Sequence, residues 1–236
     1  MAHYHRVLVK LSGEALGLDG KLFDHVMIER VAHTIAEAAQ RGTQIGLVVG
    51  AGNIWRGRQG PSANMDAVLA DHMGMLGTLI NSIAMQDALI SQGVTATVMS
   101  AVPVGRFAVD YSPIEARRRL DAGEVLLFAC GIGNPLFSTD TAAAMRSIEI
   151  KADALLLAKN VDGVYDDDPR KNPAARLIKD ITYREAERRS LKVMDTAALV
   201  LCRENNMPLT RVFALSEPDN ILKVLDGNDA GTFVHP

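Results

Sequence analysis

The sequence predicts an α/β protein, a three-layer αβα sandwich with a mostly parallel central sheet. Short apolar runs alternate with longer segments of helical pattern along the whole chain. The runs at 46–49, 125–128 and 154–157 are continuously apolar instead of alternating with polar residues. Such runs indicate strands buried on both faces, which is typical of parallel strands covered by helices. Because no Gly/Ser-rich or Pro-rich linker divides the chain, we expect one domain over residues 1–236.

The individual elements follow from local patterns. Strands are expected, in chain order, at residues 6–11, 44–49, 95–99, 125–129, 154–158 and 210–213. Helices are expected near 24–41, 66–92, 113–122, 140–150, 182–190, 195–205 and 217–226. Ser112 and Thr182 each precede a Glu by three residues, the spacing of a capping box, so both are predicted to cap a helix. Gly74 and Gly77 lie inside the long 66–92 segment and predict close packing or a break there.

Composition excludes several classes of protein. With 25 Lys+Arg and 28 Asp+Glu the net charge is −3, which argues against a nucleic-acid partner. Aromatic residues make up only 5%, too few for base-stacking platforms. Cys130 and Cys202 are the only cysteines, too few for a disulfide framework or a four-ligand zinc site. No apolar run of about 18 residues and no signal stretch occur, so we expect a cytoplasmic protein with no membrane partner.

Glycine-rich polar turns follow several of the predicted strands. Such turns begin at Lys10, Gly50 and Gly131, and a further polar turn begins at Lys159. In a parallel α/β sheet, ligands bind at the carboxyl ends of the strands. Backbone N–H groups in glycine-rich turns can hold phosphate groups there. For any single loop, the alternative is that the glycines only permit a tight turn.

The turns match neither standard phosphate motif. Leu22 follows Gly20 and Lys21, so the Walker pattern fails, and Trp55 occupies the third glycine position of the dinucleotide fingerprint. Several anion cradles at one edge of a sheet nevertheless favour phosphoryl transfer, which needs positioned cations and backbone donors.

Two cations are candidates for this chemistry. Lys10 ends the first predicted strand, where it could meet a transferring phosphoryl group. Arg56 could bind a phosphate through two parallel hydrogen bonds. The alternative for each is a solvated surface charge.

Taken together, these segments resemble the amino acid kinase superfamily, most closely its bacterial UMP kinase family. The resemblance runs in family order over nearly the whole chain. It rests on 10–15 (KLSGEA), 48–53 (VVGAGN), 55–57 (WRG), 71–76 (DHMGML), 133–140 (GNPLFSTD), 161–165 (VDGVY), 168–169 (DP) and 191–195 (LKVMD). The 71–76 and 133–140 segments are specific to the UMP kinase family.

The resemblance implies a transferase that moves a phosphoryl group from ATP to UMP. It implies catalytic roles for Lys10, Asp140 and Asp195, the two aspartates organising the surroundings of Lys10 and Mg²⁺. The implied ATP-binding residues are Lys10, Leu11, Ser12, Gly13, Gly52, Arg56, Asn160, Tyr165 and Asp168. The implied UMP-binding residues are Ala51, Gly52, Arg56, Asp71, Ile132, Gly133, Asn134, Pro135, Leu136, Phe137, Ser138 and Thr139.

The resemblance also implies how the chain is divided and what regulates it. Residues up to about 150 would bind the acceptor and the remainder, about 151–236, would bind ATP. Mg²⁺ would be bound with ATP, chiefly through ATP oxygens and not in a dedicated protein metal site. A homohexamer built from dimers is implied, with GTP as an activator and UTP as an inhibitor.

Two departures from the family pattern bear on the site. Ala51 stands where the family often has a glycine, so a left-handed backbone conformation there would be costly. The 16–24 segment also differs from the usual loop. The alternatives are a carboxylate kinase of the same fold and a non-catalytic nucleotide-binding regulator or storage protein. Arg56, Asp71 and the 133–139 loop favour a nucleoside monophosphate as acceptor.

Overall fold

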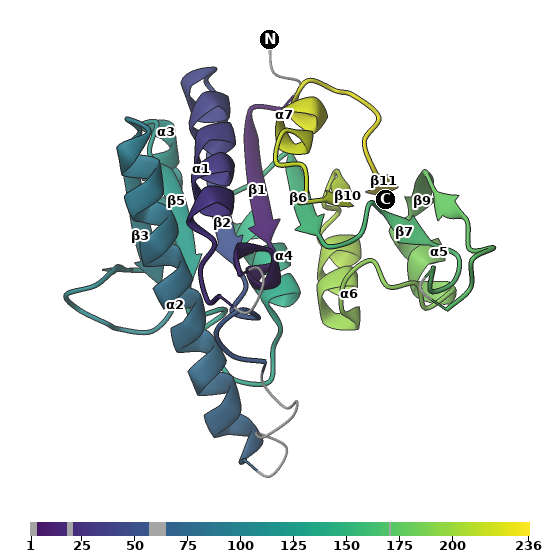
Figure 1. Cartoon of the computed structure of the whole chain (residues 1–236), viewed down its shortest axis with the longest axis horizontal. Helices are drawn as coiled ribbons and strands as arrows, with labels where there is room; N and C mark the ends of the chain where they lie inside the picture. Colours follow the sequence, from purple (N-terminus) through teal and green to yellow (C-terminus); the bar gives the residue numbers. More distant parts are fainter. Residues whose placement is uncertain (1–3, 18–20, 57–64, 170) are drawn as a thin grey trace.

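The computed structural model describes residues 4–17, 21–56, 65–169 and 171–236, and its centre is a long twisted sheet (Figure 1). The strands of this sheet are β1 (Arg6–Leu11), β2 (Gln44–Val49), β3 (Ala96–Ser100), β4 (Val109–Asp110), β5 (Val125–Ala129), β6 (Ala154–Lys159), β9 (Asp180–Thr182), β10 (Thr210–Ala214) and β11 (Thr232–His235). Their order is β4-β3-β5-β2-β1-β6-β10-β11-β9, and only the β10–β11 pair is antiparallel. A separate antiparallel ribbon pairs β7 (Val164–Tyr165) with β8 (Leu177–Ile178).

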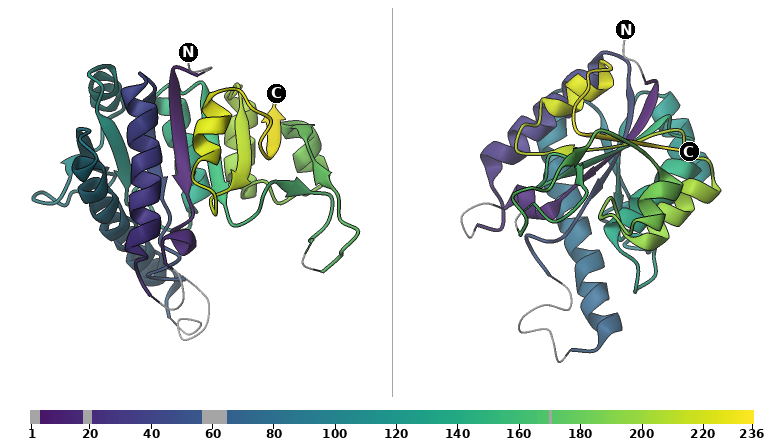
Figure 2. Two further views of the ribbon diagram at one scale, coloured as in Figure 1. Left: turned by 45° about the horizontal axis from the view of Figure 1, so that its top comes forward. Right: turned by 90° about the vertical axis from the view of Figure 1, so that its right-hand side faces the viewer.

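Helices cover both faces of the sheet, which gives three layers (Figure 2). They are the 3-10 turn η1 (Gly13–Leu16) and the α-helices α1 (His25–Gln40), α2 (Ala67–Ser91), α3 (Pro113–Asp121), α4 (Thr139–Glu149), α5 (Tyr183–Arg188), α6 (Thr196–Glu204) and α7 (Asn220–Leu225). One core lies between the sheet and α1, α2 and α7. A second core lies between the sheet and α3, α4, α5 and α6. The predicted fold class is therefore confirmed.

Strand β1 shows why its sequence is continuously apolar. Val7 and Val9 enter the first core, whereas Leu8 between them enters the second. Each strand residue thus needs an apolar side chain on whichever face it points to. Because Leu11 is paired with Val49 of β2 and with Ala158 of β6, the three strands end side by side. The loops that follow them meet at this carboxyl edge of the sheet.

The two predicted helix caps differ in whether the side chain makes the capping hydrogen bond. Thr182 caps α5 as predicted, with its Oγ1 accepting a hydrogen bond from the Glu185 N–H at 3.1 Å. Ser112 is the N-cap residue of α3 as predicted, with Pro113 after it at the helix start, but its side chain makes no capping hydrogen bond. Glu115, the other half of that capping box, instead receives hydrogen bonds from Arg118 and Arg119.

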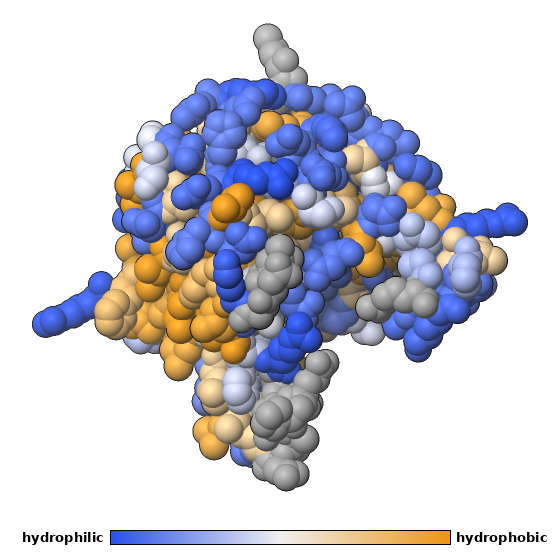
Figure 3. Space-filling view, viewed as in Figure 1, coloured by the Kyte–Doolittle hydropathy of each residue, from blue (hydrophilic) through white to orange (hydrophobic). Residues whose placement is uncertain are grey.

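Helix α2 is unbroken and has a largely apolar exposed face. Of the two alternatives predicted for its glycines, close packing holds at Gly77, where an added Cβ would lie 2.9 Å from the Ala51 Cβ. Figure 3 shows apolar side chains gathered over α2, and the large exposed ones on this helix are Val68, Leu69, Met73, Leu76, Ile80, Ile83 and Ile90. No helix among the described residues is long and apolar enough to cross a membrane.

Candidate active site

Three charged side chains meet at the carboxyl edge of the sheet, and we call them the lysine centre. Lys10 is the second-to-last residue of β1 and is buried, with 8% of its surface exposed. Its Nζ lies 3.1 Å from Oδ1 of Asp140, which is in the first turn of α4. Lys159, the last residue of β6, places its Nζ 2.9 Å from Oδ2 of the same carboxylate. One aspartate therefore holds two lysines from neighbouring strands.

The charges of the lysine centre stabilise one another. Burial alone would raise the pKa of Asp140, but the ammonium groups of Lys10 and Lys159 outweigh it and hold that pKa below its usual value. The carboxylate is therefore ionised at neutral pH. Two ammonium groups against one carboxylate leave positive charge in excess, which suits a site for phosphoryl oxygens.

Sequence reasoning did not assign Lys159 a role. The lysine also donates a 2.7 Å hydrogen bond to the Val193 carbonyl, which fixes its position further. The sequence held one clue to Lys159. Strand β6 is apolar until its last residue, which is a lysine, and β1 also carries a lysine, Lys10, next to its end. Recognising its importance required knowing that β6 lies directly beside β1.

Asp195 contacts the starts of two helices, α4 and α6. Its carboxylate accepts hydrogen bonds from the Thr141 hydroxyl at 3.0 Å and from the Ser138 hydroxyl. It also caps α6 by accepting from the Ala198 N–H at 3.0 Å. Asp195 thus ties the first turn of α4, which carries Asp140, to the start of α6. Its predicted catalytic role, organising the surroundings of Lys10 and Mg²⁺, remains a prediction.

On one side of the lysine centre lies a cavity of about 740 Å³, which we call the Asp71 cavity. It is lined by Glu14, Ala51, Trp55, Arg56, Ala70, Asp71, Gly74, Met75, Thr78, Gly131, Asn134, Pro135, Phe137, Ser138, Thr139 and Asp140. Nine residues predicted to bind UMP or to act in catalysis are in this set: Ala51, Arg56, Asp71, Asn134, Pro135, Phe137, Ser138, Thr139 and Asp140. Asp71 also accepts a 2.7 Å hydrogen bond from the Leu136 N–H, which holds the 133–139 loop against α2.

The remaining loop residues shape this cavity without lining it. Leu136 has a positive φ of 74°, and its side chain is exposed. Gly133 has a φ of 89°, and an added Cβ would lie 2.9 Å from the Ala101 carbonyl oxygen. Ile132 lies between Gly131 and Gly133 in the same turn and is outside the cavity lining.

The glycines after β1 and β2 are required by close approach of two loops. An added Cβ on Gly13 would lie 2.1 Å from the carbonyl oxygen of Gly50 and 2.8 Å from the N of Gly52. Gly50, Ala51 and Gly52 all lack a positive φ. The cost expected for a left-handed Ala51 therefore does not arise, since this loop needs small residues and not a left-handed backbone.

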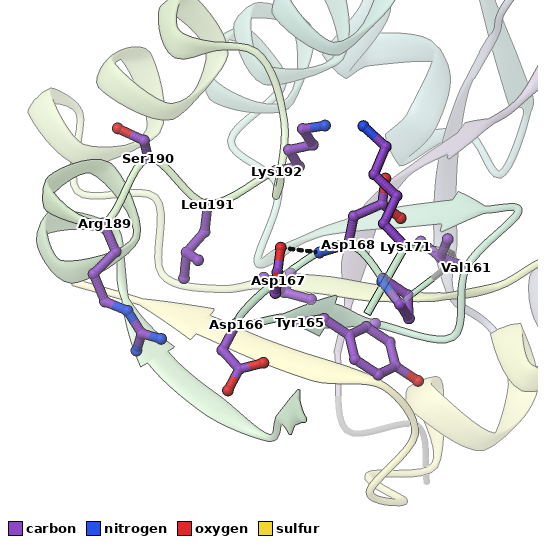
Figure 4. A pocket seen from close by; sticks show the side chains of 13 residues that line it. Val161, Tyr165, Asp166, Asp167, Asp168, Lys171, Arg189, Ser190, Leu191 and Lys192 are labelled. Atoms are coloured by element: carbon purple, nitrogen blue, oxygen red, sulfur yellow. Dashed lines mark hydrogen bonds between the residues drawn. The ribbon is translucent and has the colours of Figure 1, made fainter. Parts of the chain in front are cut away.

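A second cavity, of about 350 Å³, is formed by the segments that follow β6 and α5, and we call it the Tyr165 cavity (Figure 4). It is lined by Val161, Gly163, Val164, Tyr165, Asp166, Asp167, Asp168, Pro169, Lys171, Arg189, Ser190, Leu191 and Lys192. Tyr165 and Asp168, both predicted to bind ATP, are in this set. Asp167 accepts a 2.7 Å hydrogen bond from the Asp168 N–H, drawn dashed in Figure 4, which stiffens the turn.

Not every predicted ATP residue reaches the Tyr165 cavity. The Asn160 side chain turns to Glu14, with its Nδ2 3.2 Å from Oε2. The Leu11 side chain is buried in the core, so only its backbone could contact a ligand. Ser12 donates its backbone N–H to the Ala158 carbonyl at 3.2 Å, which joins the turn after β1 to β6.

One short segment connects the Tyr165 cavity to the lysine centre. Leu191 and Lys192 line the cavity, and the next residue, Val193, provides the carbonyl that holds Lys159. Asp195 follows two residues later and fixes α4. A ligand in the Tyr165 cavity would therefore contact the same segment that positions the lysine centre.

Comparison with known proteins gives the same fold and family. Residues 5–210 match the model of the amino acid kinase family. The chain is 49% identical over 232 residues to a uridylate kinase of Xanthomonas campestris, covering 98% of this chain and 96% of the relative. It is 46% identical over 240 residues to a uridylate kinase of Parabacteroides distasonis, covering 100% of both. The crystal structure of the UMP kinase from Bacillus anthracis superposes with a TM-score of 0.94 at 36% identity, covering 98% of this chain and 96% of that one.

The layered fold, with a lysine centre at the carboxyl edge of its sheet that lines one cavity and is held by the segment lining another, defines an α/β protein of the phosphotransferase class. The chain belongs to the amino acid kinase family, among its uridylate kinases.

Proposed function

We propose that this chain is a UMP kinase, which transfers the γ-phosphoryl group of Mg·ATP to UMP and releases UDP and ADP. The observation that carries the proposal is the lysine centre, whose Asp140 lines the Asp71 cavity and whose Lys159 is held by Val193, the residue after the Tyr165 cavity lining. The Asp71 cavity would take UMP, and the Tyr165 cavity would take the nucleoside part of ATP. The acceptor would then bind to the N-terminal part of the chain, about 1–150, and ATP to the C-terminal part, about 151–236.

In this arrangement, each group would have a separate role. The phosphate of UMP is ionised at neutral pH, so its oxygen attacks the γ-phosphorus without a general base. The main obstacle is the repulsion between two polyanions, which positioned cations and backbone donors offset. Lys10 and Lys159 would neutralise the transferring group, while Arg56 would bind the UMP phosphate and Asp71 the ribose. Asp140 would keep both lysines in place and would not itself take a proton.

Mg²⁺ would enter with ATP as part of the substrate. Both carboxylate oxygens of Asp140 face lysine ammonium groups, which makes this aspartate a poor candidate for a direct ligand. We therefore propose that the ion is held mainly by ATP oxygens, as Mg²⁺ is in many phosphoryl-transfer sites.

The activity test compares ADP release from Mg·ATP with UMP, CMP, dTMP, aspartate, glutamate and acetylglutamate as acceptors. Release with UMP alone supports the proposal. Release with a carboxylate would indicate a carboxylate kinase of the same fold. Absence of release with every acceptor, also with GTP present, would indicate a non-catalytic nucleotide-binding protein. Parallel titrations with GTP and UTP test the proposed activation and inhibition.

A homohexamer assembled from dimers is part of the proposal. Its support in this chain is the apolar face of α2, since a run of large exposed apolar side chains on one helix is typical of an interaction surface. Light scattering at micromolar concentration tests it, and a strict monomer would contradict it.

A further inference from the structure

Glu14 lies where the two proposed nucleotide sites meet. It is the second residue of η1, which follows the end of β1 at Leu11. Its Oε1 lies 3.6 Å from an Nη atom of Arg56, which lines the Asp71 cavity. Its Oε2 accepts a 3.2 Å hydrogen bond from Nδ2 of Asn160, which begins the loop after β6. One carboxylate therefore contacts a residue from each half of the site.

The surrounding backbone leaves room for this carboxylate. An added Cβ on Gly52 would lie 2.7 Å from Cγ of Glu14. The loop after β2 can therefore pass beside Glu14 only because position 52 carries no side chain. Three loops, after β1, β2 and β6, thus converge on the Glu14 side chain.

A carboxylate at this location needs an explanation. The site is proposed to bring together two polyanionic nucleotides, and an additional negative charge raises the electrostatic cost. The compensating benefit of Glu14 is that it restricts the movement of the two side chains it contacts, Arg56 and Asn160. An exposed arginine loses side-chain entropy when it binds a phosphate, and holding it beforehand reduces that loss. The Arg56 side chain is 63% exposed, and its ion pair with Glu14 restrains the guanidinium.

We propose that Glu14 is a positioning residue that orients Arg56 for the acceptor phosphate and Asn160 for the donor nucleotide. This inference rests on the proposed function, because it concerns the same two nucleotide sites. Glu14 touches no reacting atom in this role. It couples the acceptor half to the donor half through the two oxygens of one side chain.

The two oxygens allow the contributions to be separated. In Glu14→Gln the charge facing Arg56 is lost, but an oxygen that can accept from Asn160 remains. In Glu14→Ala both contacts are lost. The Glu14→Gln variant should raise the Kd for UMP about two- to five-fold, the range for loss of an exposed ion pair. Its Kd for a non-hydrolysable ATP analogue should stay unchanged, whereas Glu14→Ala should weaken both ligands.

The experiment is calorimetric titration of the full chain with UMP and with the ATP analogue. Glu217→Gln is the matched control, because it breaks an exposed ion pair of 3.8 Å with Arg30 on α1. A double variant, Glu14→Gln with Arg56→Gln, should bind UMP no more weakly than Arg56→Gln alone, since the two changes remove the same interaction.

The outcomes separate the inference from the proposed function. If Glu14→Gln binds UMP as tightly as the wild type or more tightly, Glu14 does not position Arg56 and the inference is overturned. Additive effects in the double variant would also overturn it. If the wild-type chain itself does not bind UMP, the proposed function fails and the inference fails with it.

Discussion

The Nζ of Lys10 lies 3.1 Å from Oδ1 of Asp140, so the end of the central strand is joined by an ion pair to the first turn of α4. The same carboxylate holds Lys159 through its other oxygen, at 2.9 Å. This arrangement is asymmetric. Losing one lysine leaves Asp140 with a partner, whereas losing Asp140 leaves two ammonium groups without their shared counter-charge.

The asymmetry predicts the effect of Lys10→Ala. Turnover should fall by at least about 100-fold, because the variant lacks a cation at the transferring group. The free energy of unfolding should change little by comparison, since Lys159 still neutralises Asp140. Steady-state kinetics and urea denaturation measure the two effects, with Lys223→Ala at an exposed position of α7 as the control. Unchanged turnover would show that the assignment of Lys10 is wrong.

Asp140→Asn should change how stability depends on pH. Because the folded-state pKa of Asp140 is lowered, its contribution to stability is present above the unfolded pKa of about 3.9 and is lost as pH falls through the folded value. The wild type should therefore exceed Asp140→Asn in free energy of unfolding by a constant amount from about pH 5 to 7. That difference should shrink below about pH 4, as measured by urea denaturation across the pH range. A difference that widened on acidification would contradict the lowered pKa.

The fold was largely predictable because strands buried on both faces are continuously apolar, a pattern that is visible in the sequence. Strands β1, β2 and β5 begin and end at the predicted residues. The unpredicted elements, such as β4 and β7, have only two residues each, too few for any periodicity. Ser112 begins α3 as predicted, but the capping box is not formed, because Glu115 pairs with arginines on the folded helix surface.

The sequence predicted individual residues of the candidate site better than the contacts between them. The resemblance named Lys10 and Asp140, and the structure brings them together. It did not name Lys159, whose role depends on which strand lies beside β1. Nor did it give a role to Glu14, whose importance appears only when the loops after β1, β2 and β6 converge. Contacts between segments distant in sequence are fixed by the topology and not by local pattern.

Both cysteines should be unreactive in the folded protein. Cys202 is fully buried, and that burial raises its pKa to about 12, with smaller effects from Thr210 and Asp195. Cys130 is buried too, which raises the pKa of its thiol. A thiol reagent at pH 8 should therefore label neither cysteine until denaturant is added, and then both, because the thiolate is the reactive form. Cys202→Ser should leave a single thiol in the unfolded chain. Rapid labelling of the native protein would contradict the buried positions.

Two glycines one turn apart on α2 should respond in opposite directions to alanine. At Gly74 the nearest atom to an added Cβ is Cδ1 of Trp55 at 3.7 Å, an ordinary contact. Gly74→Ala should therefore stabilise the protein by up to about 1 kcal/mol, the gain in helix propensity. At Gly77 the added Cβ would lie 2.9 Å from that of Ala51, so Gly77→Ala should destabilise by about 1–3 kcal/mol through overpacking.

The same two variants, Gly74→Ala and Gly77→Ala, distinguish an effect on stability from an effect on UMP binding. Gly77→Ala would push on Ala51, which lines the Asp71 cavity, so its KM for UMP should rise while its KM for ATP stays closer to that of the wild type. Urea denaturation and steady-state kinetics on both variants give the comparison. If Gly74→Ala proved the more destabilising of the two, the close packing of α2 against the loop after β2 would be wrong. Because both changes add one methyl group to the same helix, the difference between them reports the contact of Gly77 with Ala51 and not helix propensity.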